Sequence, residues 1–186
     1  MIGDQIVHNK EFTPLFFKTE IDKRVSQLAR EIAVEYDGKK PIFIGILNGS
    51  FIFASDLFKQ VNIEAEITFI KLLSYKGTSS SGHVVRSLGL EESLFNRHVI
   101  IIEDIIDTGT TLHSFLPEIM EHQPASLKIA TFLTKPSALK YDIKADYVGF
   151  EIEDKFVVGY GLDYDGLGRN FNNLYILKDD DSGQTE

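Results

Sequence analysis

The sequence predicts one α/β domain, a parallel sheet with helices packed on both of its faces. Apolar runs typical of buried strands alternate along the chain with segments that have the periodicity of helices. The apolar runs are rich in isoleucine and almost unbroken, as expected for strands that are covered on both faces. No Pro/Gly-rich linker and no internal repeat interrupts the sequence. We therefore expect a single domain at 1–178 and a polar tail at 179–186.

The first predicted element is a helix that ends near Gly38. Its start is indicated by Thr19 and Asp22, which have the spacing of a capping box. One apolar face then follows at helical spacing: Ile21, Val25, Leu28 and Ile32.

The later elements alternate between short apolar runs and helical segments. They are a strand at 41–47, a helix at 51–61, a strand at 65–73, a strand at 99–106, a helix at about 111–122 and a strand at 127–134. Parallel sheets of this kind bind ligands beyond the carboxyl ends of their strands, where the strand order reverses.

The stretch from Ser74 to Gly89, SYKGTSSSGHVVRSLG, separates two of these strands and is dense in Ser and Gly. It can bury too little apolar surface to offset the entropy lost on ordering. It is therefore either a flexible hairpin tip or a lid that orders over a substrate.

Composition limits the class of protein. At 186 residues the chain can bury most of its apolar surface, and 43% hydrophobic and 25% charged residues are typical of soluble globular proteins. No apolar run approaches the roughly 20 residues that span a bilayer, and the amino end has no signal-peptide pattern. With no cysteine and a net charge of -9, we expect a cytoplasmic protein that binds neither nucleic acid nor anionic membranes.

One predicted strand carries acids inside an apolar run. The segment VIIIEDIIDTGTTL holds Glu103, Asp104 and Asp107 before a small turn rich in hydroxyl groups. If that turn opens a helix, its free backbone N–H groups favour a phosphate, and Gly109 permits the tight bend. Carboxylates beside a phosphate need sugar hydroxyls, a magnesium ion or a proton to bind.

We therefore expect Glu103 and Asp104 to bind sugar hydroxyls or Mg²⁺, and Asp107 to handle a proton. The alternative is that these are exposed strand-end acids followed by an ordinary helix cap. The tripeptide DTG alone would favour that alternative, because it also occurs at aspartic-protease sites. The nine residues EDIIDTGTT after an apolar strand favour the binding site.

This segment resembles the phosphoribosyl-pyrophosphate signature of the type I phosphoribosyltransferases. Three others resemble the hypoxanthine-guanine branch: GILNGSFIFASDL its pyrophosphate loop, LSYKGTSSSG its mobile catalytic loop, and DYVGFEIEDKFVVGYGLDYDGLGRN its purine-binding region. The resemblance runs from about Gly45 to Leu177. It implies the type I phosphoribosyltransferase fold, a central parallel sheet flanked by helices. A small hood would come from the N-terminal segment and about 136–178.

The resemblance implies a role for each residue of the acidic segment. Glu103 and Asp104 would meet the ribose hydroxyls and help to hold magnesium, and Asp107 would exchange a proton with the imidazole nitrogen of a purine. The ribose phosphate would lie in the turn that follows: Thr108, Gly109, Thr110 and Thr111.

The resemblance also implies a purine site. Lys135 would donate to the six-oxo group, which favours oxopurines over adenine, Phe156 would stack on the ring, and the Val157 backbone would bind its edge. Asp163 would border the base and supply a further magnesium ligand. Taken alone, Lys135 would be a solvated strand-end lysine and Phe156 a core residue.

For the pyrophosphate, the resemblance implies Asn48, Gly49 and Arg169, with a cis peptide bond at Leu47–Asn48. Many family members carry lysine where this chain has Asn48, so the mode of pyrophosphate binding is less well defined than the phosphate turn. In the mobile loop, the implied substrate contacts are Ser74 and Tyr75.

The implied reaction transfers the phosphoribosyl group from phosphoribosyl pyrophosphate to hypoxanthine or guanine with Mg²⁺, through an oxocarbenium-like transition state. The expected partners are these small molecules and further copies of the chain, as a homodimer or homotetramer. Two alternatives stay open: a transferase that prefers xanthine, and a nucleotide-sensing regulator that kept the fold without the chemistry.

Overall fold

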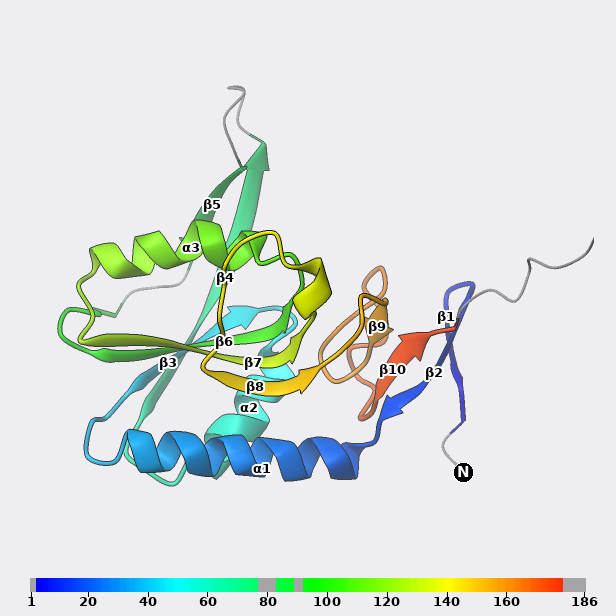
Figure 1. The fold of residues 1–186 in the computed structure, drawn as a ribbon, viewed down its shortest axis with the longest axis horizontal. Helices are drawn as coiled ribbons and strands as arrows, with labels where there is room; N and C mark the ends of the chain where they lie inside the picture. Colours follow the sequence, from blue (N-terminus) through cyan, green and yellow to red (C-terminus); the bar gives the residue numbers. More distant parts are fainter. Residues whose placement is uncertain (1–2, 77–82, 89–91, 179–186) are drawn as a thin grey trace, which may run out of the picture.

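The computed structural model describes residues 3–76, 83–88 and 92–178. Its main sheet has six strands in the order β5-β4-β3-β6-β7-β8 (Figure 1). Five of them run parallel: β3 (Ile42–Leu47), β4 (Glu66–Lys76), β6 (His98–Ile106), β7 (Ser126–Thr134) and β8 (Tyr147–Glu151). The predicted α/β class with a parallel sheet is thus confirmed.

Helices cover both faces of this sheet (Figure 1). Helices α1 (Lys18–Glu35) and α2 (Phe51–Gln60) lie on one face, and α3 (Thr110–Glu121) lies on the other. Alternate residues of β6 enter the two cores, Ile100 and Ile102 on the α1 and α2 side and Val99 and Ile101 on the α3 side. Among the described residues, no helix combines the length and the apolar character that crossing a bilayer requires.

The start of α1 differs from the prediction. The N–H of Phe17 donates to the carboxylate of Glu20 at 2.9 Å, so the cap lies two residues before the predicted Thr19. Asp22 instead pairs with the Nζ of Lys18 at 2.5 Å, as an i,i+4 neighbour. The helix also ends at Glu35 rather than near Gly38, because the chain has already turned there.

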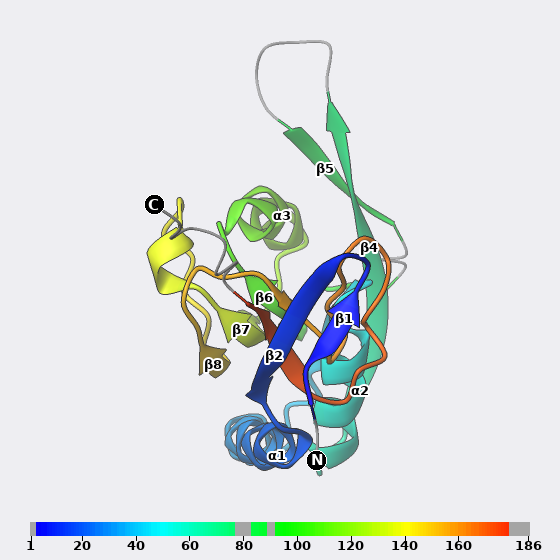
Figure 2. The ribbon, with the colours of Figure 1, turned by 90° about the vertical axis from the view of Figure 1, so that its right-hand side faces the viewer.

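A second, smaller sheet was not predicted strand by strand. It is antiparallel, in the order β1-β2-β10-β9, and joins two distant parts of the chain. Its strands are β1 (Gln5–Val7), β2 (Lys10–Phe16), β9 (Val157–Val158) and β10 (Leu174–Leu177). The sheet lies beside the main one, with β1 and β2 toward the viewer in Figure 2. It therefore places Val157 at the edge of a cavity described below.

The polar stretch between 74 and 89 is in part a hairpin. Strand β4 continues to Lys76, and β5 (His83–Leu88) pairs with it in antiparallel register from Lys71↔Leu88 to Lys76↔His83. The two strands project together from the main sheet (Figure 1). Residues 77–82 and 89 lie outside the described residues, so the lid role of this stretch stays a prediction.

Replacing Leu28 by Ala should lower the free energy of unfolding by about 2–5 kcal/mol, because Leu28 is fully buried on the inner face of α1. The matched control is Val34→Ala in the same helix, where the side chain is 83% exposed. Its effect should stay within about 0.5 kcal/mol. Urea denaturation measures both, and equal losses would contradict the assigned face of α1.

Candidate active site

The candidate site lies where the strand order of the main sheet reverses. From β3 the chain moves outward to β4, whereas from β6 it moves to β7 on the opposite side. The pairing of β3 with β6 ends at Gly45↔Ile102, and the residues of β6 and of the turn beyond this point line a cavity, the crevice of this site. The expected cis peptide bond at Leu47–Asn48 is present in the loop after β3.

Glu103 and Asp104 lie inside β6 at this crevice. Glu103 is only 7% exposed, and in the described part of the chain no donor reaches its Oε2. Burial, and then the charge of Asp104, raises the pKa of Glu103 well above its usual value. Burial likewise raises the pKa of Asp104 to about 6. The hydrogen bond that the Ile105 N–H donates to Asp104 at 2.8 Å acts in the opposite direction and lowers this pKa. The interpretation as exposed strand-end acids is therefore wrong for Glu103.

The turn after β6 forms the start of α3. Gly109 caps the helix in the left-handed region at φ 75°, and Thr110 is the first helical residue, one residue earlier than predicted. The hydroxyls of Thr108 and Thr110 lie 2.9 Å apart, and the Lys140 N–H donates to the Thr108 carbonyl at 3.0 Å. Residues 103–112 line a cavity of about 250 Å³ here. The acids and the first residues of α3 thus line one cavity; its role in binding a sugar phosphate stays a prediction.

A second cavity, of about 230 Å³, shares Asp104, Ile105 and Asp107 with the first. Its other lining residues are Lys135, Phe156, Val157, Leu162 and Asp163.

Lys135 follows β7 and precedes the short 3₁₀ helix η1 (Pro136–Ala138). Lys135 is 6% exposed, and its Nζ donates to Asp107 at 3.0 Å and to Asp154 at 3.3 Å. Lys135 is therefore a buried cation at this cavity, not a solvated strand-end lysine.

Phe156 is half-exposed rather than buried in the core. Its ring centroid lies 5.5 Å from that of Tyr164, edge to face, and 6.3 Å from that of Phe12. One side of the ring is thus held by aromatic neighbours while the residue borders the second cavity. Val157 is buried in β9 and pairs with Ile176 of β10.

The loop after β3 packs against the acids through glycine. A Cβ on Gly49 would lie 1.3 Å from Oδ2 of Asp104, and one on Gly161 would lie 2.1 Å from the Gly49 carbonyl. Arg169 donates to the Gly161 carbonyl at 2.7 Å and pairs with Asp163 at 2.6 Å. These contacts bring the predicted pyrophosphate residues Gly49 and Arg169 to the same side of the crevice; Asn48 is exposed there.

The donors for a metal are hard carboxylate oxygens. Within residues 3–76, 83–88 and 92–178, no group of three or more His, Cys, Asp or Glu side chains forms a metal cluster. The unpartnered oxygen of Glu103 and the adjacent Asp104 still fit Mg²⁺, which binds through one or two carboxylates and completes its shell with water and substrate oxygens. Asp163, the further predicted ligand, is bound to Arg169 and to the Gly166 N–H, at 2.7 Å.

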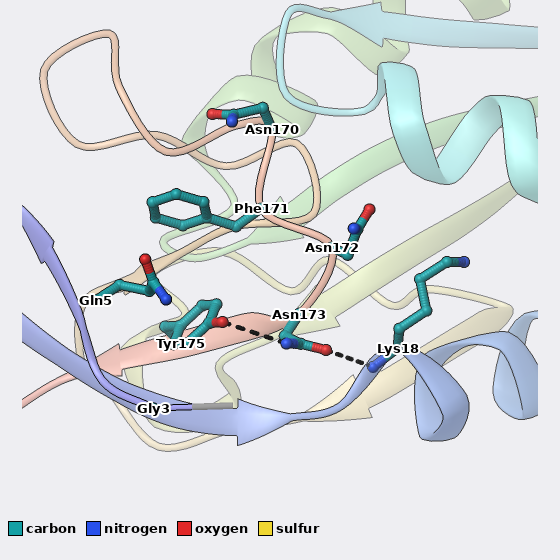
Figure 3. A pocket seen from close by; sticks show the side chains of 8 residues that line it. All are labelled: Gly3, Gln5, Lys18, Asn170, Phe171, Asn172, Asn173 and Tyr175. Atoms are coloured by element: carbon teal, nitrogen blue, oxygen red, sulfur yellow. Dashed lines mark hydrogen bonds between the residues drawn. The ribbon is translucent and has the colours of Figure 1, made fainter. Parts of the chain in front are cut away.

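A larger cavity, of about 540 Å³, lies elsewhere, between the start of α1 and the segment that precedes β10 (Figure 3). Among its lining residues, Asn173 accepts from the Lys18 N–H at 2.8 Å and donates to the Tyr175 hydroxyl at 3.2 Å. No residue predicted for the site lines it. We therefore place the chemistry in the two smaller cavities.

Three residues that matter in this geometry were not predicted: Asp154 on Lys135, Gly161 against Gly49, and Tyr164 against Phe156. Each acts through a tertiary contact: Gly161 lies 112 residues from Gly49, Asp154 lies 19 from Lys135, and Tyr164 lies only 8 from Phe156. Asp154 and Gly161 both lie in the segment that resembles the purine-binding region, but no spacing rule distinguishes them from surface residues.

A family model for the phosphoribosyl transferase domain matches residues 18–165. The chain therefore belongs to the phosphoribosyltransferase family. It is 46% identical over 166 residues to the hypoxanthine-guanine phosphoribosyltransferase of Bacillus subtilis. That match covers 88% of this chain and 92% of the relative. A crystal structure of a hypoxanthine phosphoribosyltransferase from Staphylococcus aureus superposes with a TM-score of 0.84 at 41% identity, covering 89% of this chain and 90% of that one. Within the family, the chain thus falls in the hypoxanthine-guanine branch.

A bifunctional relative has a different size. The chain is 41% identical over 178 residues to the bifunctional protein TilS/HprT of Listeria monocytogenes. The match covers 95% of this chain and 27% of that relative, so the chain spans about a quarter of its length.

Replacing Gly49 by Ala should destabilise the protein by about 1–3 kcal/mol, because the added methyl group would overlap the Asp104 carboxylate and force the loop away. Gly3→Ala is the matched control, since a Cβ there meets nothing within 4 Å. The measurement is urea denaturation of both variants. An unchanged midpoint for Gly49→Ala would show that the loop does not need this close approach.

Proposed function

We propose that the chain transfers the 5-phosphoribosyl group of phosphoribosyl pyrophosphate to hypoxanthine or guanine. The products would be inosine or guanosine monophosphate and pyrophosphate, a purine-salvage reaction. The observation that carries this proposal is the pair of adjoining cavities, one suited to a sugar phosphate and one to an oxopurine, with Asp104, Ile105 and Asp107 between them. Membership of the hypoxanthine-guanine branch supports it.

The ribose phosphate would occupy the first cavity. The N–H groups at the start of α3 and the Thr108 and Thr110 hydroxyls donate to its oxygens. Glu103 and Asp104 accept from the ribose hydroxyls, which suits an oxygen that lacks a donor. Oriented in this way, the anomeric carbon faces the second cavity, where the base lies.

In the second cavity the base would lie against Phe156, with its edge on the Val157 backbone and Asp163 nearby. The ammonium of Lys135 donates to the six-oxo group. Asp107 accepts a hydrogen bond from the imidazole N–H and takes its proton as the new bond to the ribose forms. One residue thus links the recognition of the base to the chemistry.

The pyrophosphate would leave on the side of Asn48, Gly49 and Arg169. Bound Mg²⁺, held by Glu103 and Asp104 with Asp163 nearby, would neutralise charge on the phosphate oxygens. The transition state is oxocarbenium-like and reacts with water, so the stretch from Ser74 to Gly89, which begins with Ser74 and Tyr75 on β4, should exclude solvent.

A transferase that prefers xanthine is the nearer alternative, because one hydrogen bond near Val157 or Asp163 changes the ranking of oxopurines. A nucleotide-sensing regulator is the more distant one. It would be expected to present a basic face to nucleic acid, whereas this chain has a net charge of -9. We further propose that the chain acts as a homodimer or homotetramer.

The test of the proposed function is a product assay with phosphoribosyl pyrophosphate, Mg²⁺ and, separately, hypoxanthine, guanine, xanthine or adenine. We expect inosine or guanosine monophosphate, and no product when a chelator is added. No product from any base, with protein shown to be folded, would favour the regulator.

Asp107→Asn should lower kcat by roughly 10²- to 10⁴-fold, because the amide keeps the shape of the carboxylate but cannot take the proton. The dissociation constant for phosphoribosyl pyrophosphate should stay within about threefold of the wild-type value. Steady-state kinetics and equilibrium binding separate the two effects. Equal losses in both would make Asp107 a binding residue rather than the proton carrier.

Lys135→Ala should lower the preference for hypoxanthine over adenine by about tenfold or more, since the charge-assisted hydrogen bond to the six-oxo group is lost. The readout is the ratio of kcat/KM for the two bases. Lys144→Ala, in the same segment but exposed, serves as the control. An unchanged ratio for Lys135→Ala would reject its role in selecting the base.

A further inference from the structure

Lys135 is held by two carboxylates rather than one. Its Nζ lies 3.0 Å from Oδ2 of Asp107 and 3.3 Å from Oδ1 of Asp154. The lysine side chain is only 8% exposed, while those of Asp107 and Asp154 are 46% and 62% exposed. The buried Lys135 Nζ thus lies between two more exposed carboxylates rather than in a single enclosed ion pair.

The two carboxylates come from different parts of the site. Asp107 follows β6 and borders both cavities, whereas Asp154 lies in the loop between β8 and β9 and lines neither. The same loop continues into Phe156 and Val157. Lys135 thus connects the proton-carrying residue to the segment that surrounds the base.

The donors of the ammonium group can be counted. A lysine ammonium has three N–H donors and no acceptor. Asp107 and Asp154 account for two of them, and Lys135 also borders the second cavity, where the third can meet a ligand acceptor. A six-oxo group supplies that acceptor, whereas the six-amino group of adenine presents another donor.

We infer that Asp154 is a positioning residue for base selection: it draws the Lys135 ammonium away from full pairing with Asp107 and directs its remaining donor at the six-oxo group. This inference deepens the proposed function and rests on it. Without Asp154, Lys135 turns toward Asp107, so the oxopurine loses its donor and the proton carrier is more firmly paired.

The experiment measures equilibrium binding of inosine monophosphate and adenosine monophosphate by calorimetry, which needs no turnover. The variants are Asp154→Asn, Asp154→Glu and Asp154→Asn combined with Lys135→Ala. Glu153→Gln is the matched control, because it removes the same charge from the adjacent exposed position. Melting temperatures accompany each measurement.

Asp154→Asn should weaken binding of inosine monophosphate by about tenfold, as expected when one charge-assisted hydrogen bond is misdirected. Binding of adenosine monophosphate and the melting temperature should stay close to wild type. Asp154→Glu should recover most of the loss, and Glu153→Gln should cause none. In the Lys135→Ala background, Asp154→Asn should raise the dissociation constant of inosine monophosphate by less than about twofold, because the effect of Asp154 passes through Lys135.

The inference is overturned if Asp154→Asn weakens both nucleotides equally, matches Glu153→Gln, or acts undiminished without Lys135. A wild-type chain that does not bind inosine monophosphate would overturn it as well. If the wild type forms no product yet shows the expected binding pattern, the proposed function fails and the role of Asp154 in recognition stands. If product forms but the pattern is absent, only the inference about Asp154 fails.

Discussion

The structure depends on the register of β3 against β6. Because their pairing stops at Gly45↔Ile102, the backbone of β6 runs on without a partner on that side, and Glu103 and Asp104 enter the crevice there. A slip by one residue would exchange the two faces of the strand, place apolar side chains in the crevice and separate Asp104 from Gly49. Two layers of helices fix that register, since each face of β6 must meet its own core. The position of the two acids in the candidate site is thus a consequence of how the core packs.

For an acidic protein, the proposed anionic substrate requires local sources of positive potential. The cations of this site, Lys135 and Arg169, are each paired with carboxylates in the described structure, so neither is a free charge waiting for a ligand. The start of α3 supplies the rest through backbone N–H groups, whose orientation is fixed by the helix and does not depend on side-chain pairing. In the proposed function, a ligand would therefore exchange partners with groups that are already ordered. This arrangement favours selectivity over raw attraction.

The parallel sheet and its helices could be predicted because their signals are local: isoleucine-rich runs and one-sided periodicity. The predicted start of α1 was wrong because Thr19 and Asp22 match the spacing of a capping box. The cap in the structure is Phe17 with Glu20, which has the same spacing, and the sequence pattern does not decide between the two pairs. Strands β2 and β10 were missed because β2 contains Pro14 and its partner lies some 160 positions along the chain, as in the pair Phe12↔Leu177. The role of the acidic segment was predicted from chemistry and from resemblance together, and the purine-binding residues were predicted from resemblance alone; both stay predictions. Asp154 has no such signal, because its contact with Lys135 exists only where the segments after β6, β7 and β8 meet.

The smaller sheet joins the beginning of the described chain to its end, with β2 beside β10 and Lys178 bonded to Glu11 at 2.9 Å. Val157, at the edge of the second cavity, sits on the strand that β10 completes. During synthesis the chain emerges from its amino end, and a single domain generally folds as a unit. The second cavity can therefore have its full set of strands only after β10 has left the ribosome. The residues that join the two cavities, Asp104, Ile105 and Asp107, are made well before that strand.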